Sequence, residues 1–203
     1  MRESAYGLFP VSFVSFPSPR SLFVTPAQFS PLPTFVIGLG GNIEPRLVAL
    51  RAAVSRLNGL DTIRFLAVSP VYESKPWGMA DQPDFLNAAA LAESHLAPLD
   101  LLEALLDIER QLGRDRSKEA RHWGPRSIDL DVLFAPGLVM DDPRLTIPHP
   151  RLRERDFALR PLLDLLPDAA DPRDATPYAR VLQTLGASSL RLFAPPEALT
   201  GGR

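Results

Sequence analysis

The chain has 203 residues, 45% of them hydrophobic, which is enough to bury the core of one domain with additional tails. Its net charge of −2 excludes a general attraction to nucleic acid or anionic membranes, and no apolar run approaches the ~20 residues that cross a bilayer. The lack of cysteine excludes disulfides and thiolate chemistry, fits a reducing cytoplasm, and leaves oxygen or imidazole as metal ligands.

Residues 1–33 form the first segment, which is rich in proline and phenylalanine and has no sustained periodicity. A targeting peptide is one interpretation, because Arg2 and Arg20 face only one acidic residue, Glu3. The segment has no uninterrupted apolar core followed by a small-residue cleavage site, which favours a disordered extension instead. We therefore expect the folded domain to begin at Thr34.

Six elements are expected next, and their order defines the fold class. Pro98 opens the second of two helices, and Gly59 and Gly113 follow the two helices as C-terminal stops. The order strand, helix, strand, strand, helix, strand is the split βαβ pattern of ferredoxin-like α+β domains, which pack helices on an antiparallel sheet. In chain order the elements are a strand over residues 34–40, a helix over 46–58, strands over 62–74 and 84–94, a helix over 98–112 and a strand within 121–134.

The last third of the chain gives a weaker pattern. Residues 144–166 predict a loop followed by a helix, and residues 170–203 carry no recognisable chemistry. We therefore expect a folded domain over residues 34–169 and a C-terminal extension over the rest of the chain.

The glycine-rich stretch GLGGN, residues 38–42, does not match either common nucleotide-binding loop. It is neither the G-x-x-x-x-G-K-[ST] pattern nor a complete G-x-G-x-x-G pattern. We interpret it as a tight turn from strand to helix, in which glycine supplies unusual backbone angles.

Asp129 and Asp131 interrupt an apolar strand, although aspartate is depleted in strands. Residues two apart project from one face, so the two carboxylates repel each other unless a cation lies between them, while Ile128, Leu130 and Val132 point into the core. Mg²⁺ binds such oxygen ligands, usually one or two carboxylates with substrate phosphates.

The alternative to a metal site is that both aspartates lie on the solvated face of an edge strand. A cationic loop before the pair favours metal-assisted phosphoryl transfer, and its residues are Arg114, Arg116, Arg121, His122 and Arg126.

Four stretches of the sequence resemble one known family. They are DQPDFLNA at residues 81–88, GRDR at 113–116, GPRSIDLDVL at 124–133 and RLTIPHPRLRERDF at 144–157. From Thr34 to Asp168 the chain is similar to the 6-hydroxymethyl-7,8-dihydropterin pyrophosphokinase family of folate biosynthesis. The resemblance implies transfer of a pyrophosphoryl group from ATP to the hydroxymethyl group of a reduced pterin, with release of AMP. It also implies a ferredoxin-like core with mobile loops over the site, in a cytoplasmic monomer that binds small molecules rather than nucleic acid or membranes.

Matched by position, the resemblance implies a role for each candidate residue. Asp129 and Asp131 correspond to the ligands of two Mg²⁺ ions that bridge the phosphates of the co-substrate ATP. The arginines implied in catalysis are Arg114, Arg116, Arg121 and Arg126. The residues implied in nucleotide binding are Glu109, Arg144, Thr146, His149 and Arg155. The residues implied in pterin binding are Asn42, Ser74, Trp77, Phe85, Asn87, Trp123 and Phe157.

The pterin set is chemically coherent, although some members have a plainer interpretation. A flat bicyclic ring stacks on aromatic faces, and a side-chain amide can bond its polar edge. Core packing is the alternative for Phe85 and Trp77, and a surface turn is the alternative for His149, which lies between two prolines.

Three features depart from the usual pattern of the family. The loop from Arg116 to Trp123 is longer than the commonest form by two residues, and Lys75 replaces a usual proline. His122 stands where an arginine usually precedes the aromatic residue, so the phosphate contact falls to either Arg121 or His122. We expect the loop 114–125 to be mobile without ligands, because its arginines repel one another until a triphosphate neutralises them.

Two other functions fit parts of the pattern. Ferredoxin-like sheets carry paired aspartates in other metal-dependent nucleotidyl or phosphoryl transferases, from which a pterin requirement for AMP formation would distinguish this chain. Such sheets also bind single-stranded RNA through exposed aromatic residues. Here two acids occupy the face that RNA would need, and salt-sensitive RNA binding is the observation that would favour this function.

Overall fold

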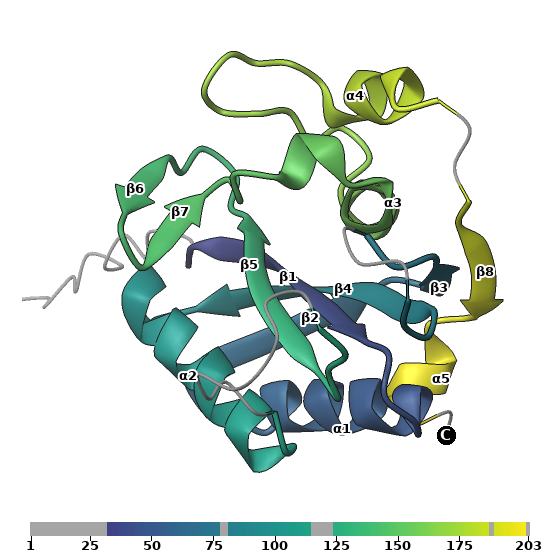
Figure 1. Ribbon diagram of the computed structural model, residues 1–203. Coiled ribbons are helices and arrows are strands. Elements are labelled where there is room, and N and C mark those ends of the chain that lie inside the picture. The colour runs from purple at the N-terminus through teal and green to yellow at the C-terminus, as the bar shows by residue number, and fades with distance from the viewer. Residues whose placement is uncertain (1–31, 78–80, 115–123, 187–188, 202–203) are drawn as a thin grey trace, which may run out of the picture. The chain divides into compact units, whose positions relative to one another are not determined.

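An antiparallel sheet of six strands lies at the centre of residues 31–203 (Figure 1). The computed structural model describes residues 32–77, 81–114, 124–186 and 189–201. The strand order is β5-β1-β4-β3-β8, and β2 also pairs with β4, so helices and an antiparallel sheet make a mixed fold. The strands are β1 (Thr34–Gly41), β2 (Ile63–Val68), β3 (Val71–Ser74), β4 (Phe85–Ser94), β5 (Asp129–Phe134) and β8 (Arg191–Ala194).

Helices cover both faces of the sheet (Figure 1). α1 (Arg46–Asn58) and α2 (Pro98–Gln111) pack on one face, where they share the larger core with alternate residues of β1, β4 and β5. α3 (Asp156–Leu165) packs on the opposite face against Val36, Ala89 and Leu133. No helix in the described ranges has both the length and the apolar character needed to cross a membrane. The smaller elements are β6 (Met140–Asp142), β7 (Leu145–Ile147), a 3₁₀ turn (Leu152–Glu154), α4 (Tyr178–Thr184) and α5 (Glu197–Thr200).

The six predicted elements are present, and one of them is divided in two. The strand expected over residues 62–74 is β2 followed by β3, and both pair with β4. The break falls at Ser69 and Pro70, because proline has no amide hydrogen to donate to a neighbouring strand. Ser69 continues the contact with β4 in another way: its amide donates to the carbonyl of Ala89, and its hydroxyl accepts from the Ala89 amide, both at 2.9 Å.

The sequence does not predict the β6–β7 hairpin or the strand β8. β6 and β7 have three residues each, which is too short for a periodic pattern. β8 pairs with β3 and forms one edge of the sheet. The C-terminal segment, which the sequence predicts to be a separate extension, therefore contributes a strand to the central sheet. Arg191 of β8 and Arg46 of α1 both bind the carboxylate of Glu73 in β3, Arg46 at 3.0 Å.

The glycine-rich stretch is part of a strand, and our interpretation of it as a turn is wrong. Gly38, Gly40 and Gly41 lie within β1, and none of them has a positive φ. Gly41 is required for space, because a Cβ atom there would stand 2.5 Å from the carbonyl oxygen of Ser127. The close approach of two backbones therefore explains this glycine, rather than an unusual backbone angle.

A buried carboxylate holds the loop between α3 and α4. Asp171 is fully buried and accepts hydrogen bonds from Nε of Arg153 and Nε of Arg173, both at 2.8 Å. The hydrogen bond from Arg173 is the main reason that the pKa of Asp171 falls from 3.8 to about 2. Because the pKa of Asp171 is lower in the folded state, its ionised carboxylate stabilises the fold at any pH above its unfolded-state pKa of 3.8. This stabilisation is lost as the pH falls toward 2.

We predict that Asp171→Asn lowers the free energy of unfolding by about 2 kcal/mol at pH 7 and by much less near pH 2. The ionised carboxylate accepts from two guanidinium groups, and an amide cannot replace both charge-assisted bonds. Urea denaturation of both proteins at the two pH values measures the difference, with exposed Asp168→Asn as the control. An equal difference at both pH values would show that the charge of Asp171 does not stabilise the loop.

Candidate active site

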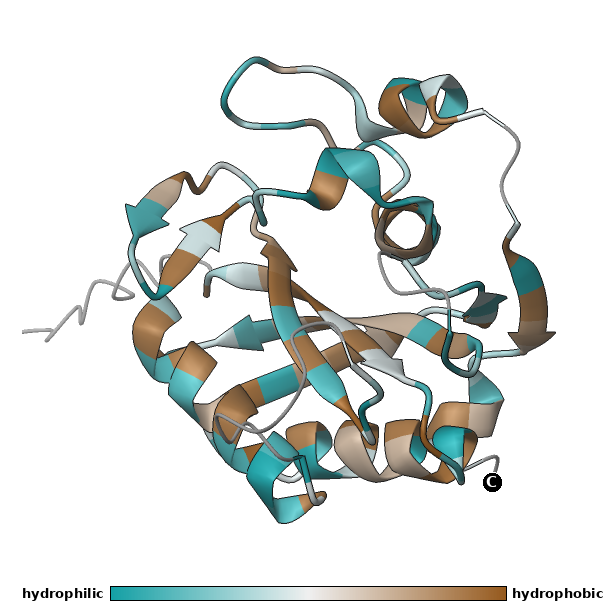
Figure 2. Cartoon of the chain, viewed as in Figure 1, coloured by the Kyte–Doolittle hydropathy of each residue, from teal (hydrophilic) through white to brown (hydrophobic). Residues whose placement is uncertain are grey.

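Asp129 and Asp131 project from the face of β5 opposite to Leu130 and Val132, which are buried in the larger core. The alternation predicted from the sequence is thereby confirmed, and Figure 2 shows it as bands of opposite hydropathy along β5. In the register with β1, Asp129 lies opposite Gly40 and Asp131 lies opposite Gly38. Because glycine has no side chain, β1 places no side-chain atoms beside either carboxylate.

Two arginines reach the carboxylate of Asp129. Nη1 of Arg126 lies 3.1 Å from Oδ2, and Nη2 of Arg114 lies 3.6 Å from Oδ1. The three side chains are between 15% and 22% exposed, so solvent screens these charges only weakly. Arg114 follows α2, whereas Arg126 belongs to the loop before β5, and the fold brings the two segments together at the acid.

Arg155 brings further positive charge to the aspartate pair. Burial lowers the pKa of Arg155, and the negative charges of Asp131 and Asp129 oppose this effect. The positive charges of Arg151 and Arg126 lower the pKa of Arg155 as well, which places these guanidinium groups within electrostatic reach of one another. More guanidinium groups than carboxylates therefore meet here, and such an excess suits a polyanionic ligand.

Aromatic rings lie against the same arginines. The guanidinium of Arg126 is 5.1 Å from the centre of the Phe85 ring, which is buried. The guanidinium of Arg155 is 4.9 Å from the Trp77 ring and 5.7 Å from the Phe157 ring. Core packing explains the burial of Phe85, but it does not explain why each ring faces a cation. The contacts bring three predicted pterin-side residues next to two predicted phosphate-side arginines.

Buried polar side chains lie beside these rings in β3 and β4. Nδ2 of Asn87 donates to Oγ of Ser74 at 2.9 Å, and both side chains are buried. Asn87 lies opposite Gly40 in the sheet, and a Cβ atom at Gly40 would stand 3.5 Å from Oδ1 of Asn87. A side chain at position 40 would therefore contact the carbonyl oxygen of Asn87, and glycine avoids that contact.

Glu109 supports the strand that carries the aspartates. Its side chain is fully buried at the end of α2, and Oε1 accepts a hydrogen bond from the amide of Leu130 at 2.6 Å. Leu130 lies between the two aspartates, so this bond holds β5 at the point from which both carboxylates project.

His149 lies close to the charged cluster. Burial, followed by the positive charge of Arg155, lowers the pKa of His149 to about 4, and the charge of Asp129 opposes this shift. The imidazole is therefore neutral at pH 7. Nδ1 of His149 accepts a hydrogen bond from the amide of Arg151 at 3.2 Å, which orients the ring.

Arg144 and Thr146 lie on the β6–β7 hairpin. Arg144 is exposed, and its ion pairs in the described part of the chain are with Glu103 at 3.6 Å and Asp142 at 3.8 Å. Thr146 is half-buried on β7, opposite Asp141. The structure thus places Arg144 beside α2 and gives it no ion pair with the two aspartates of β5 among the described residues.

The remaining predicted site residues are Arg116, Arg121, His122 and Trp123, which lie outside the described residues. The predicted mobility of the loop 114–125 falls largely on the same undescribed range. The roles that the sequence predicts for these residues stay predictions.

Sequence reasoning missed the contribution of Arg151 and of two glycines. Arg151 directly precedes the 3₁₀ turn, and its guanidinium lies 5.4 Å from the centre of the Trp77 ring. Nothing in its sequence neighbourhood distinguishes it from the other arginines nearby. Gly38 and Gly40 could have been recognised from the sequence, because they are two residues apart, as are the aspartates that they face in β5.

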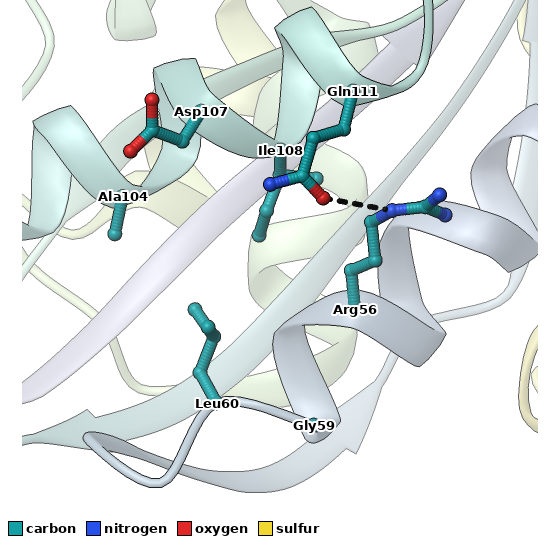
Figure 3. Close-up of a pocket in the computed structure, with 7 residues that line it drawn as sticks. All are labelled: Arg56, Gly59, Leu60, Ala104, Asp107, Ile108 and Gln111. Carbon is teal, nitrogen blue, oxygen red and sulfur yellow. Dashed lines mark hydrogen bonds between the residues drawn. The ribbon is translucent and has the colours of Figure 1, made fainter.

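A hollow elsewhere on the molecule lacks this chemistry. It lies between the ends of α1 and α2, where Nε of Arg56 donates to Oε1 of Gln111 at 3.3 Å (Figure 3). Leu60 and Ile108 line it, and none of the predicted site residues does. The candidate active site is therefore the charged cluster on the opposite face of the sheet.

Comparison with known proteins points to one family. A family model described as 7,8-dihydro-6-hydroxymethylpterin-pyrophosphokinase (HPPK) matches residues 36–167. A 2-amino-4-hydroxy-6-hydroxymethyldihydropteridine pyrophosphokinase from Pseudomonas aeruginosa is 44% identical over 136 residues, which cover 67% of this chain and 82% of that protein. A protein of the same name from Methylorubrum extorquens is 46% identical over 132 residues, with coverage of 65% and 82%.

Longer proteins contain a similar region. The folic acid synthesis protein fol1 of Schizosaccharomyces pombe is 39% identical over 158 residues, and the match covers 78% of this chain but only 21% of that protein. The solved structure of wild-type Plasmodium falciparum HPPK-DHPS with pteroate has the same fold, with a TM-score of 0.60 at 13% identity over 75% of this chain and 44% of that one. Since the family model covers most of the sheet and the whole charged cluster, the chain belongs to the 7,8-dihydro-6-hydroxymethylpterin-pyrophosphokinase family.

Proposed function

We propose that the chain transfers the pyrophosphoryl group of ATP to the hydroxymethyl group of 6-hydroxymethyl-7,8-dihydropterin, giving the pterin diphosphate and AMP. One observation supports the proposal in addition to family membership. Arg126 contacts both the aspartate side of the site, which we call the phosphate half, and the aromatic side, which we call the pterin half. Its guanidinium pairs with Asp129 at 3.1 Å and lies over the Phe85 ring at 5.1 Å. A group that contacts the acid pair and the aromatic wall together stands where phosphate donor and pterin acceptor must meet.

The phosphate half consists of arginines with unused hydrogen-bonding capacity. Arg126 and Arg155 each bury an Nε–H that has no hydrogen-bond partner among the described residues. Buried donors are normally paired, and a phosphate oxygen would supply the missing acceptor. Phosphoryl transfer depends mainly on positioning and charge stabilisation, which these arginines provide together with Arg114, Arg116 and Arg121.

The aspartate pair fits a divalent metal. Asp131 makes no ion pair or hydrogen bond within the described part of the chain, so its oxygens are available as ligands on the face that it shares with Asp129. No group of three or more potential ligand side chains occurs in the described ranges, so phosphate oxygens and water would complete the coordination. Two Mg²⁺ ions held here would neutralise charge on the ATP phosphates and orient them.

The nucleotide side combines neutral and charged groups. His149 is neutral near pH 7, so it can hydrogen-bond to the nucleotide without adding charge. Thr146 and Arg144 extend this side along the β6–β7 hairpin. The exposed side chain of Arg144 can change its conformation to bind a nucleotide phosphate. Glu109 acts by holding Leu130, and hence the strand, in place.

The pterin half consists of aromatic and amide groups. Phe85, Phe157 and Trp77 offer ring faces to a flat bicycle, as Trp123 does in the family resemblance. Asn87 has an acceptor oxygen beside Gly40, and it can bond to the amino edge of a pterin.

The proposal includes the ferredoxin-like βαββαβ arrangement of the core. The strand order β5-β1-β4 followed by β2 and β3 supports it when β2 and β3 are counted as one interrupted strand. We also infer that residues 34–169 carry the catalytic machinery, and that the enzyme works as a monomer in the cytoplasm. Residues 1–33 would then be an extension without a catalytic role.

The direct test of the function is the release of AMP from ATP, measured with and without 6-hydroxymethyl-7,8-dihydropterin. We expect AMP only when the pterin and Mg²⁺ are both present. Release of AMP without the pterin, or of ADP in its presence, would instead favour another metal-dependent transferase.

We predict that Asp129→Asn and Asp131→Asn each reduce turnover by at least about 100-fold, because phosphoryl transfer depends on the charge held at this position. Asp131→Asn should change the melting temperature little, since it removes both the repulsion from Asp129 and the attraction to Arg155 but no ion pair of the described residues. Asp129→Asn should be the less stable of the two variants, since it weakens the pairs with Arg126 and Arg114. The control is Asp61→Asn, at an exposed turn. Full activity of both site variants would refute the metal assignment.

We predict that Arg121→Ala loses more activity than His122→Ala. A guanidinium is charged at every working pH, whereas an imidazole is mostly neutral near pH 7. Steady-state turnover of both variants between pH 6 and 8 measures the difference. If His122→Ala is the more damaged variant, and wild-type activity rises toward pH 6, the phosphate contact belongs to an imidazolium instead.

A further inference from the structure

Asn42 lies between the two halves of the site and is almost completely buried, with 1% of its surface exposed. Its Nδ2 donates to Oε1 of Gln82 and to the carbonyl oxygen of Pro83, both at 3.0 Å. Its Oδ1 accepts from the amide of Arg126 at 2.8 Å. A carbonyl oxygen only accepts and an amide N–H only donates, so these partners fix the orientation of the side chain. Both N–H groups are used, and none remains for a substrate.

The three hydrogen bonds join segments that are far apart in the sequence. Gln82 and Pro83 belong to the loop that leads into Phe85, on the pterin side. Arg126 belongs to the phosphate side, and its carbonyl oxygen also accepts from the amides of Asn42 and Ile43, at 2.9 and 3.2 Å. The backbone of Arg126 is therefore held on both its donor and its acceptor side by residues that follow β1.

We propose that Asn42 is a positioning residue that fixes the pterin side of the site relative to the phosphate side, and that it is not a ligand of the pterin. The inference rests on the proposed function, because it assigns Asn42 a part in that transfer. Transfer requires the acceptor oxygen and the phosphorus atom to meet in one geometry, and a displacement of about 1 Å can cost about 100-fold in rate. Separate binding of either substrate needs only one half of the site.

The test compares Asn42→Ala with the wild type in turnover and in binding. We expect kcat to fall about 10- to 100-fold. The dissociation constants for the pterin alone and for a non-hydrolysable ATP analogue alone, measured by calorimetry, should change by less than about threefold. Loss of Oδ1 should also speed hydrogen exchange of the Arg126 amide, a readout that does not depend on activity.

Gln82→Ala tests the same contact from the other side. It removes one of the two acceptors of Nδ2, so we expect a smaller loss of kcat than Asn42→Ala causes. In the double variant, Gln82→Ala should cause a smaller additional loss than it causes alone, because the hydrogen bond to Asn42 is already absent. If Asn42→Ala does not fold, the Gln82→Ala variant alone decides: normal kcat would overturn the proposal.

Ser69→Ala is the matched structural control. Ser69 is also buried at 1% exposure, and its hydroxyl also makes two hydrogen bonds, but both are at the break between β2 and β3. We expect a lowered melting temperature with unchanged kcat. A loss of kcat in proportion to melting temperature in both variants would mean that Asn42 has only a general structural role.

Two further results would overturn the inference. A tenfold weaker binding of the pterin alone to Asn42→Ala, with normal kcat at saturation, would make Asn42 a pterin ligand. Unchanged exchange of the Arg126 amide would mean that the contact does not hold Arg126. Failure of the proposed function is recognised separately, since the wild-type enzyme would then release no AMP in the presence of the pterin.

Discussion

The repulsion between Asp129 and Asp131 is the constraint around which the rest of the site is arranged. Two carboxylates on one strand face need nearby cations, and no single segment of the chain supplies them. Arg114 comes from the end of α2, Arg126 from the loop before β5, and Arg155 from the start of α3. The antiparallel sheet brings these segments to one place, and the glycines of β1 add no side chains of their own there.

In the proposed function, a bound triphosphate would meet arginines that the fold has already gathered beside Asp129. Without ligand they balance the carboxylates and lie over aromatic rings, contacts that are weaker than charge-assisted bonds to phosphate. When nucleotide and metal bind, the guanidinium groups would exchange carboxylate and aromatic partners for phosphate oxygens, with little movement of their own. Such preorganisation lowers the cost of ordering the site when the substrates arrive.

The sequence predicts those parts of the structure that depend on local pattern. The helices beginning at Arg46 and Pro98 follow from apolar spacing and end signals, and the orientation of the aspartates follows from the two-residue period of a strand. The roles of Gly41 and Asn42 were not predictable in this way. Each depends on which distant backbone lies opposite, Ser127 in one case and Arg126 in the other, and that is a property of tertiary packing. β8 was missed for the same reason, because it pairs with β3, which is far from it in the sequence.

The position of Trp77 gives the protein an intrinsic optical property. Two guanidinium groups lie close to its indole ring, that of Arg155 at 4.9 Å and that of Arg151 at 5.4 Å from the ring centre. The emission of an indole depends on the charges beside the ring, so any anion that draws these cations away changes the fluorescence of the chain. The sequence contains only one other tryptophan, Trp123, and replacing it with phenylalanine would assign the signal to a single ring. Occupancy of the phosphate half could thus be followed in solution without a label.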